Sequence, residues 1–170
     1  MVKSTSKVVM GTRRPWLWVV GALLLALACT AASTRPYFGP LAGARADTLP
    51  AVATTVVDAL AASVQAVGFR VQAMSAQEGY LETYWFDTRA GRSGGRYARN
   101  PGAVVRLRFF VDDARALQSV VVSEVVYRTR LDPSRGEREI EALVPLDHAG
   151  MVLLDSVMHA AAARLGVPGS

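Results

Sequence analysis

Cysteine, histidine and lysine are scarce in this sequence of 170 residues. Cys29 is the single cysteine, so no disulfide can form within the chain. Because there are only two histidines besides, a structural zinc site of four cysteine or histidine ligands is implausible, and we expect no metal or other cofactor. Lysine occurs only at positions 3 and 7, and every later basic residue is arginine. This preference for arginine fits a GC-rich coding bias and indicates no particular partner.

Acidic residues are absent from the first 28 positions, although the whole chain contains 14 of them. Four of the 19 basic residues lie in that stretch, which leaves 15 basic against 14 acidic groups and a net charge of +1 for the rest. The overall net charge of +5 therefore comes mainly from the N-terminal segment. Since a basic domain is the electrostatic signature of nucleic-acid binding, we expect no nucleic-acid partner.

A basic segment followed by an apolar run begins the chain. Residues 1–14 carry four positive charges, and the apolar run of 13 residues spans positions 16–28. This run is shorter than the roughly 20 residues needed to cross a bilayer as a helix, and it ends in small residues, as a cleaved export signal does. We therefore predict a lipoprotein signal peptide over residues 1–28. An uncleaved inner-membrane signal anchor and ordinary secretion are the alternatives.

Cys29 directly follows Leu-Ala-Leu-Ala at positions 25–28, which resembles the lipobox of bacterial lipoproteins, although leucine and alanine stand in the reverse of the usual order at positions 26 and 27. In that family the thiol receives a diacylglyceryl group, the signal is cut just before the cysteine, and the new amino terminus is acylated. The resemblance implies that Cys29 is the lipid attachment site and that its acyl chains anchor the protein in a membrane. Thr30 stands where aspartate would imply retention at the inner membrane, so we expect the periplasmic face of the outer membrane.

Residues 29–47 are expected to form the acylated cysteine and a flexible tether, because they mix small residues with prolines and glycines and show no apolar period. Residues 48–167 are expected to form one domain, since a chain of this length supports one core and not two. Apolar residues recur at helical spacing over residues 52–67 and 151–165, which predicts a helix at each end of that domain. Asp47 or Thr48, and Asp147, are the expected helix caps.

Between the two helices, four segments have strand character: residues 69–73, 80–86, 104–111 and 117–131. In the third segment, Arg106 and Arg108 lie on the face opposite its apolar residues. An order of helix, four strands and helix predicts the α+β class. We expect a two-layer domain in which an N-terminal and a C-terminal helix cover one face of a four-stranded antiparallel sheet, an arrangement of helix-grip type.

Residues 67–71, Val-Gly-Phe-Arg-Val, and residues 79–86, Gly-Tyr-Leu-Glu-Thr-Tyr-Trp-Phe, are similar to the helix-grip repeats of the BamC family. BamC is the lipoprotein C component of the outer-membrane β-barrel assembly machine. The resemblance implies a non-enzymatic lipoprotein that acts as a scaffold or assembly partner for another envelope protein. BamC-like proteins carry two such domains, whereas this chain has room for one, so the resemblance extends to fold and location and not to the partner.

No residue set typical of a catalytic site occurs in the sequence, and we expect no enzymatic activity. His148 and His159 are about three helical turns apart, too far to share a metal or a proton. No serine lies in a nucleophile-elbow sequence. Glu137, Glu139 and Glu141 alternate with arginines, which is typical of a solvated surface.

The glycine-rich segment 88–103 is predicted to be a long basic hairpin loop. Arginine and tyrosine are favoured at interfaces, so the loop is the candidate interaction surface, although a surface hairpin that binds nothing is the alternative. Its candidate residues are Arg89, Arg92, Arg96, Tyr97 and Arg99.

Three aromatic residues support a second functional hypothesis. Tyr80, Tyr84 and Phe86 are expected on the exposed face of their strand, and a helix-grip sheet can curl around an apolar ligand. The alternative function is therefore that of a carrier lipoprotein for a lipid or small apolar ligand. Core packing or contact with a partner explains the same residues.

Overall fold

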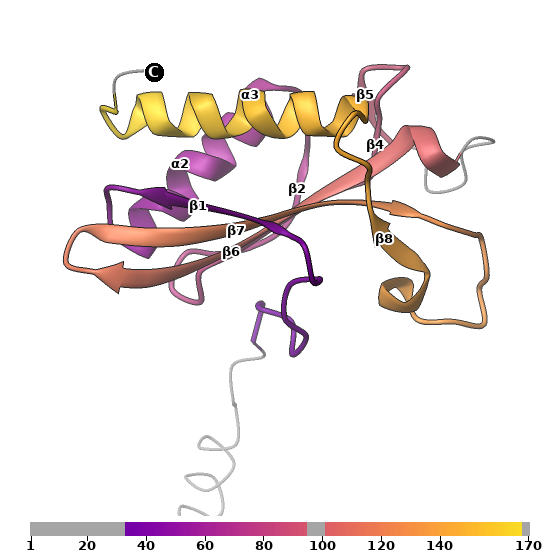
Figure 1. Ribbon diagram of the computed structural model, residues 1–170, viewed down its shortest axis with the longest axis horizontal. Helices are drawn as coiled ribbons and strands as arrows, with labels where there is room; N and C mark the ends of the chain where they lie inside the picture. Colours follow the sequence, from indigo (N-terminus) through magenta and orange to yellow (C-terminus); the bar gives the residue numbers. More distant parts are fainter. Residues whose placement is uncertain (1–32, 95–100, 168–170) are drawn as a thin grey trace, which may run out of the picture. The chain divides into compact units, whose positions relative to one another are not determined.

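An antiparallel sheet with two helices on one face makes up the described part of the chain, residues 33–94 and 101–167 of a computed structural model (Figure 1). The compact unit to which these residues belong begins at Ser33. Its elements in chain order are β1 (Arg45–Leu49), α2 (Ala53–Ala66), β2 (Val71–Ser75), β3 (Tyr80–Thr83), β4 (Phe86–Asp87), β5 (Arg92–Ser93), the 3-10 turn η1 (Pro101–Ala103), β6 (Val104–Arg115), β7 (Gln118–Arg128), the 3-10 turn η2 (Glu137–Ile140), β8 (Glu141–Leu143) and α3 (Ala149–Arg164).

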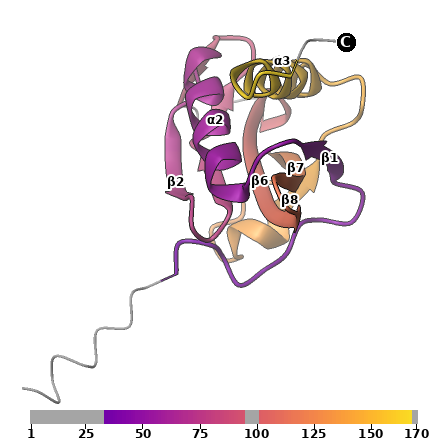
Figure 2. The ribbon, with the colours of Figure 1, turned by 90° about the vertical axis from the view of Figure 1, so that its left-hand side faces the viewer.

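The helices and the sheet share one apolar core. Both helices lie on the same side of the sheet, as the two ribbon views agree (Figures 1 and 2). Leu60 of α2, Leu107 of β6 and Leu154 of α3 are completely buried in this layer, together with valines from all three elements. The predicted α+β class, with an antiparallel sheet and two helices, is therefore confirmed.

The sheet has more strands than the predicted four. Within the described residues eight strands join it, with β1-β7-β6-β3-β2 as the main order. The four predicted segments correspond to β2, to β3 with β4, to β6 and to β7. The additional strands β1 and β8 both pair with β7, β1 along Ser119–Ser123 and β8 along Val126–Arg128. They are short and lack strict alternation, so their pairing depends on the long edge that β7 offers.

An extra residue on the way from β3 to β4 changes which face the following side chains occupy. Glu82 lies opposite Arg108 and Phe86 lies opposite Val105, so four steps along this strand match three steps along β6. Such a β-bulge moves every later side chain to the other face of the sheet. Phe86 is consequently buried on the helix side, where its ring stacks on Phe69 with the centroids 4.2 Å apart.

The prediction for the aromatic residues is wrong for two of the three, and the bulge accounts for Phe86. Tyr80 and Phe86 are both buried, and Tyr84 alone of the three is exposed. The expected row of exposed aromatics for an apolar ligand is therefore absent from the described strands β3 and β4. Alternation in the sequence predicted the faces correctly only as far as Thr83.

Both helix caps differ from the prediction. The backbone N–H of Ala53 at the start of α2 donates to the carboxylate of Asp113, 2.7 Å away, whereas positions 47 and 48 lie in β1. At the start of α3, Nδ1 of His148 accepts a hydrogen bond from the Gly150 N–H at 2.9 Å. Nε2 of His148 lies 2.8 Å from the carbonyl oxygen of Gly102. His148 therefore has a structural role.

Residues 33–47, expected to belong to a flexible tether, contact the domain. The Arg35 guanidinium donates to both carboxylate oxygens of Asp112, at 2.7 and 3.1 Å, and these bonds lower the pKa of Asp112. The N–H of Thr34 and of Arg35 donate to the Glu78 carboxylate at 2.7 and 2.9 Å. Since residues 45–47 are also part of β1, this described stretch is built into the domain. The predicted signal peptide and Cys29 lie outside the described residues.

Candidate functional site

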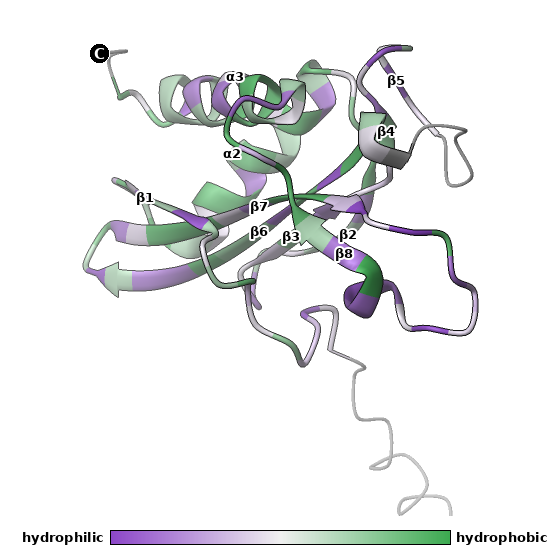
Figure 3. Cartoon of the chain, turned by 45° about the vertical axis from the view of Figure 1, so that its right-hand side comes forward, coloured by the Kyte–Doolittle hydropathy of each residue, from purple (hydrophilic) through white to green (hydrophobic). Residues whose placement is uncertain are grey.

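The sheet face opposite the helices carries charged side chains in its buried centre. On β6, Arg106 and Arg108 alternate with the apolar residues that face the helices, and β6 and β7 accordingly show both purple and green stretches in Figure 3. Glu82 of β3 and Glu124 of β7 lie in register on either side of Arg108. Arg106, Arg108 and Glu124 are only 3%, 2% and 0% exposed. Buried charges of this kind require partners close by.

The segment η2–β8 supplies further partners. It follows β7 after a turn and places Glu137, Arg138 and Glu141 over the charged face. We call the complete set the ionic cluster; it has four arginines and four glutamates, so its formal charges balance. Its members are Glu82, Arg106, Arg108, Glu124, Arg128, Glu137, Arg138 and Glu141.

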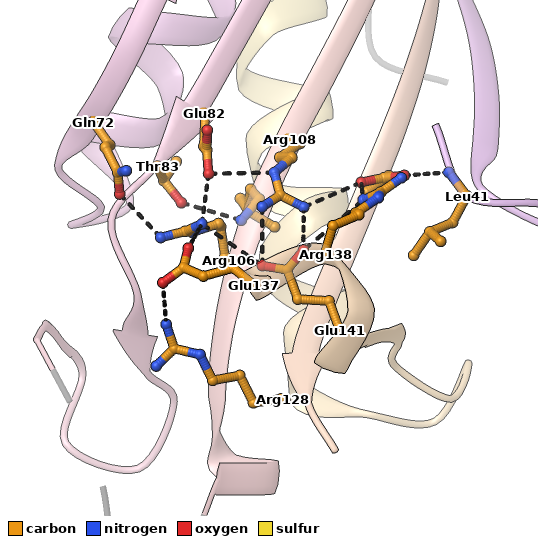
Figure 4. A network of polar contacts seen from close by, with 12 residues as sticks. Leu41, Gln72, Glu82, Thr83, Arg106, Arg108, Arg128, Glu137, Arg138 and Glu141 are labelled. Atoms are coloured by element: carbon orange, nitrogen blue, oxygen red, sulfur yellow. Dashed lines mark hydrogen bonds and ion pairs between the residues drawn. The ribbon is translucent and has the colours of Figure 1, made fainter. Parts of the chain in front are cut away.

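Paired hydrogen bonds join the arginines to the carboxylates (Figure 4). Nη1 and Nη2 of Arg108 donate to the two oxygens of Glu141 at 2.6 and 2.9 Å. Arg138 holds both oxygens of Glu124 in the same way, each at 2.8 Å. Such two-point contacts between guanidinium and carboxylate fix orientation as well as distance. They fasten the η2–β8 segment to the sheet.

The N-terminal segment covers the same cluster. Two guanidinium groups lie over the Phe38 ring, with the guanidinium carbons of Arg108 and Arg138 at 5.4 and 4.6 Å from the ring centroid. The backbone N–H of Leu41 donates to the Glu124 carboxylate (Figure 4). Residues 38–41 therefore close the ionic cluster from one side and connect it to the part of the chain that follows Cys29.

The electrostatics of the cluster raise the pKa of Arg108 and of Tyr80. Burial lowers the pKa of Arg108, but the hydrogen bonds and charge of Glu141 and the charge of Glu82 outweigh this effect and raise the pKa above its usual value. Burial raises the pKa of the Tyr80 hydroxyl, and the neighbouring Glu82 carboxylate, which accepts its hydrogen bond at 2.8 Å, raises it further. Arg108 and Tyr80 therefore stay protonated near neutral pH and act as fixed donors.

A pocket of about 280 Å³ lies beside the ionic cluster. Trp85 forms part of its wall, and the guanidinium carbons of Arg106 and Arg128 lie 4.4 and 4.2 Å from the centroid of the Trp85 ring. The residues that line the pocket come from the start of β2, the bulge before β4, β5, β6 and η2. They are Arg70, Gln72, Tyr84, Trp85, Ser93, Gly94, Arg106 and Glu137.

The predicted interaction loop is described only in part. Arg89 and Arg92 are exposed on the hairpin formed by β4 and β5, where the Asp87 carboxylate accepts hydrogen bonds from the N–H of Arg89 and Ala90. Neither arginine belongs to the ionic cluster, and Arg89 lines a second pocket, of about 540 Å³, next to the start of α3. The other candidate residues, Arg96, Tyr97 and Arg99, lie outside the described residues, as does the lipid attachment site Cys29.

The interpretation of the acidic residues after β7 as a solvated surface is wrong for Glu141, whereas the Glu137 side chain is 38% exposed. The Glu141 side chain is completely buried and Glu137 is bound to Arg106 and Arg128, whereas Glu139 is exposed. Arginines that alternate with apolar residues on β6, next to Glu82 and Glu124 on the neighbouring strands, were the signal that could have revealed a charged interior.

Fold and site together define an α+β domain with an apolar core on one sheet face and a charge-balanced cluster on the other. No protein-family model matches the chain, and a comparison with curated proteins finds no significant match. The resemblance to BamC lipoproteins stays a prediction. Among the described residues, no helix has the length and apolar character needed to cross a membrane, and no group of three or more histidine, cysteine or acidic side chains is placed to hold a metal ion.

Proposed function

We propose that the protein is a non-catalytic lipoprotein of the bacterial cell envelope that holds a scaffold domain against the periplasmic face of the outer membrane. The basic segment, the short apolar run and Cys29 after small residues support anchoring through acyl chains. The observation that carries the proposal is how few residues separate Cys29 from the described compact unit, which begins at Ser33.

A domain that starts so early stays close to its anchor. Arg35, which is bonded to Asp112, follows Cys29 by six residues. An extended chain spans at most about 3.6 Å per residue, so Arg35 would lie within roughly 20 Å of the acylated cysteine. Such a short connection suits a protein that positions a partner at the membrane surface better than one that reaches far into the periplasm.

The free edge of β2 is the surface that we assign to a partner protein. Within the described sheet β2 pairs with β3 alone, so its other edge keeps unpaired backbone groups. An open edge strand is a ready site for an added strand from another chain. Gln72 and Met74 of β2 have exposed side chains there, with the exposed ring of Tyr84 nearby on the adjoining strand connection.

The carrier function receives less support. A helix-grip carrier would hold its apolar ligand between the sheet and the helices. That layer is occupied by the protein's own core, in which Leu60, Leu107 and Leu154 are completely buried. We therefore prefer the scaffold, and keep the carrier as an outcome that the second experiment below can reveal.

Replacing Cys29 tests the anchor. Full-length wild-type protein and the Cys29→Ser variant are expressed in a bacterial host with labelled palmitate, with Thr30→Ser as the control. We expect label and the mass of a processed, acylated protein for the wild type and for Thr30→Ser, and an unlabelled precursor for Cys29→Ser. Equal labelling and mass of all three proteins would rule out a lipoprotein.

Site-specific crosslinking tests the scaffold. A photoreactive amino acid is placed at Gln72 on the β2 edge, at Arg89 in the predicted interaction loop, and at the exposed Gln65 of α2 as the control. A discrete protein adduct from Gln72 and not from Gln65 would support a partner at the edge strand. An adduct with lipid alone would favour the carrier, and equal adducts from all three positions would contradict a defined docking surface.

A further inference from the structure

Two residues that line the pocket beside the ionic cluster, Trp85 and Arg106, each have a buried donor that lacks an acceptor among the described residues. Trp85 and Arg106 are 4% and 3% exposed, and both line this pocket. Within the described part of the chain, neither Nε1 of Trp85 nor Nε of Arg106 has a hydrogen-bond partner. Buried N–H groups without an acceptor are rare in folded proteins and call for an explanation. A ligand that brings an acceptor atom into the pocket would supply one.

Arg70 gives the pocket an excess of positive charge. Its side chain is exposed at the pocket, its guanidinium carbon lies 5.2 Å from the centroid of the Tyr84 ring, and it forms no ion pair with any described residue. By contrast, Arg106 is neutralised by Glu82 at 2.6 Å and by Glu137 at 3.0 Å. Among the described residues of the lining, the one free charge is thus a guanidinium, the group that binds a carboxylate at two points.

The carboxylate in the lining does not cancel this charge. Glu137 is held by Arg106 at 3.0 Å and by Arg128 at 2.6 Å, so two guanidinium groups already compensate it. The same contacts fix the position of Arg106, whose Nη2 also donates to Gln72 at 3.0 Å. Donors that are held in place before the ligand arrives bind it with a smaller loss of conformational entropy.

The size and the walls of the pocket restrict the ligand further. A volume of about 280 Å³ is near the lower end of the range of small-molecule sites. Trp85 and Tyr84 contribute aromatic surface to the lining, against which a planar apolar group can pack.

From these observations we infer that the pocket binds a small carboxylic acid with a planar apolar body. The carboxylate accepts hydrogen bonds from Trp85 Nε1 and from the Arg70 guanidinium, and the body of the ligand lies against Tyr84. This site goes beyond the proposed scaffold function and does not depend on it, since it makes no use of the lipid anchor or of a partner strand.

The indole N–H signal of Trp85 reports on this site directly. The full chain is labelled with ¹⁵N-tryptophan in detergent micelles, and the variant Trp85→Phe distinguishes the Trp85 signal from those of Trp16 and Trp18. Sodium benzoate serves as the probe, and benzamide, of the same shape without the charge, as the matched comparison. We expect benzoate to shift the Trp85 signal saturably and with an affinity about tenfold or more above that of benzamide, a difference of about 1.4 kcal/mol.

A pair of variants distinguishes binding of benzoate at this pocket from a general attraction of benzoate to a positively charged surface. Arg70→Gln removes the free guanidinium, and Arg115→Gln removes an exposed arginine at the other end of β6. We expect about tenfold weaker binding of benzoate by Arg70→Gln and unchanged binding by Arg115→Gln, with both variants unfolding at the wild-type temperature. Three results would overturn the proposal: no saturable shift with benzoate, equal binding of benzamide, or equal binding of inorganic phosphate.

Discussion

Gly79, in the turn between β2 and β3, occupies a position that only glycine fits. Its φ of +62° lies in the left-handed region, and a Cβ there would lie 1.9 Å from the carbonyl oxygen of Val111. The Gly79 carbonyl in turn accepts a hydrogen bond from the Val111 N–H at 2.8 Å. The backbone of the turn therefore packs directly on the backbone of β6.

We expect Gly79→Ala to lower the free energy of unfolding by about 3 kcal/mol or more, because a strained φ costs about 1–2 kcal/mol and the turn must also move away from β6. Gly91→Ala is the matched control, since Gly91 has nearly the same φ, +63°, and open space around it. That variant should lose only the smaller, conformational part. Denaturant unfolding of both variants measures the difference, and equal losses would contradict the close approach of the two backbones.

At the scale of elements, the η2–β8 segment is bound both by backbone pairing of β8 with β7 and by buried ion pairs. Its Glu141 side chain is completely buried in the ionic cluster, and Arg108 of β6 is the main partner of that carboxylate. Removing one partner of a buried ion pair leaves the other charge without compensation, which costs more than the pair contributes when it is intact.

Glu141→Gln should consequently lower the free energy of unfolding by about 3 kcal/mol, near the lower end of the range for broken buried ion pairs. Glu139→Gln, two positions earlier, changes a carboxylate that is 62% exposed and 3.9 Å from Arg135, so a change within about 0.5 kcal/mol is expected. Chemical denaturation and hydrogen exchange of the β7–β8 amides provide the measurements. A Glu141→Gln variant as stable as Glu139→Gln would mean that the segment is not held by this contact.

The helices and the four main strands were predictable, because apolar spacing reports directly on which side chains enter a core. The same alternation placed Arg106 and Arg108 correctly on the face away from the helices. Register between strands is not encoded in this way, so the sequence did not predict that Glu82 and Glu124 flank Arg108. The bulge after Thr83 was missed for the same reason, since it depends on how the strand pairs with β6.

Local spacing misled the interpretation of Glu141. Arg138 and Glu141 are three residues apart, as on the surface of a helix, and alternating charge over a short segment usually indicates solvent. In the fold their carboxylate and guanidinium groups lie 3.9 Å apart, but both point into the ionic cluster, and their stronger partners come from β6 and β7. The long-range pairing of charges decided the burial, and the spacing of residues within the η2–β8 segment contains no record of it.

At the scale of the whole described unit, the sheet has two interiors of different chemistry. The helix side is an apolar core, and the opposite side is the ionic cluster with a small group of buried apolar residues at Trp85, Val104 and Val126. Phe38 and Leu41 contact the second interior, and Arg35 binds Asp112 at the surface nearby. The described segment nearest to the proposed membrane anchor is thereby part of the folded domain, and we expect its attachment to contribute to the free energy of unfolding.

Phe38 and Tyr37 are adjacent in the chain and test this attachment as a matched pair. The Phe38 ring contacts the guanidinium groups of Arg108 and Arg138, whereas the side chain of Tyr37 is fully exposed. We expect Phe38→Ala to lower the free energy of unfolding by about 2 kcal/mol, from two partly desolvated cation–π contacts and lost apolar packing, and Tyr37→Ala to change it by less than about 0.5 kcal/mol. Thermal unfolding and limited proteolysis of the full chain in detergent give the comparison: Phe38→Ala should also be cleaved faster between residues 33 and 44. Equal stability and equal cleavage of the two variants would show that this segment behaves as the flexible tether predicted from composition, and the domain would then move freely relative to its anchor.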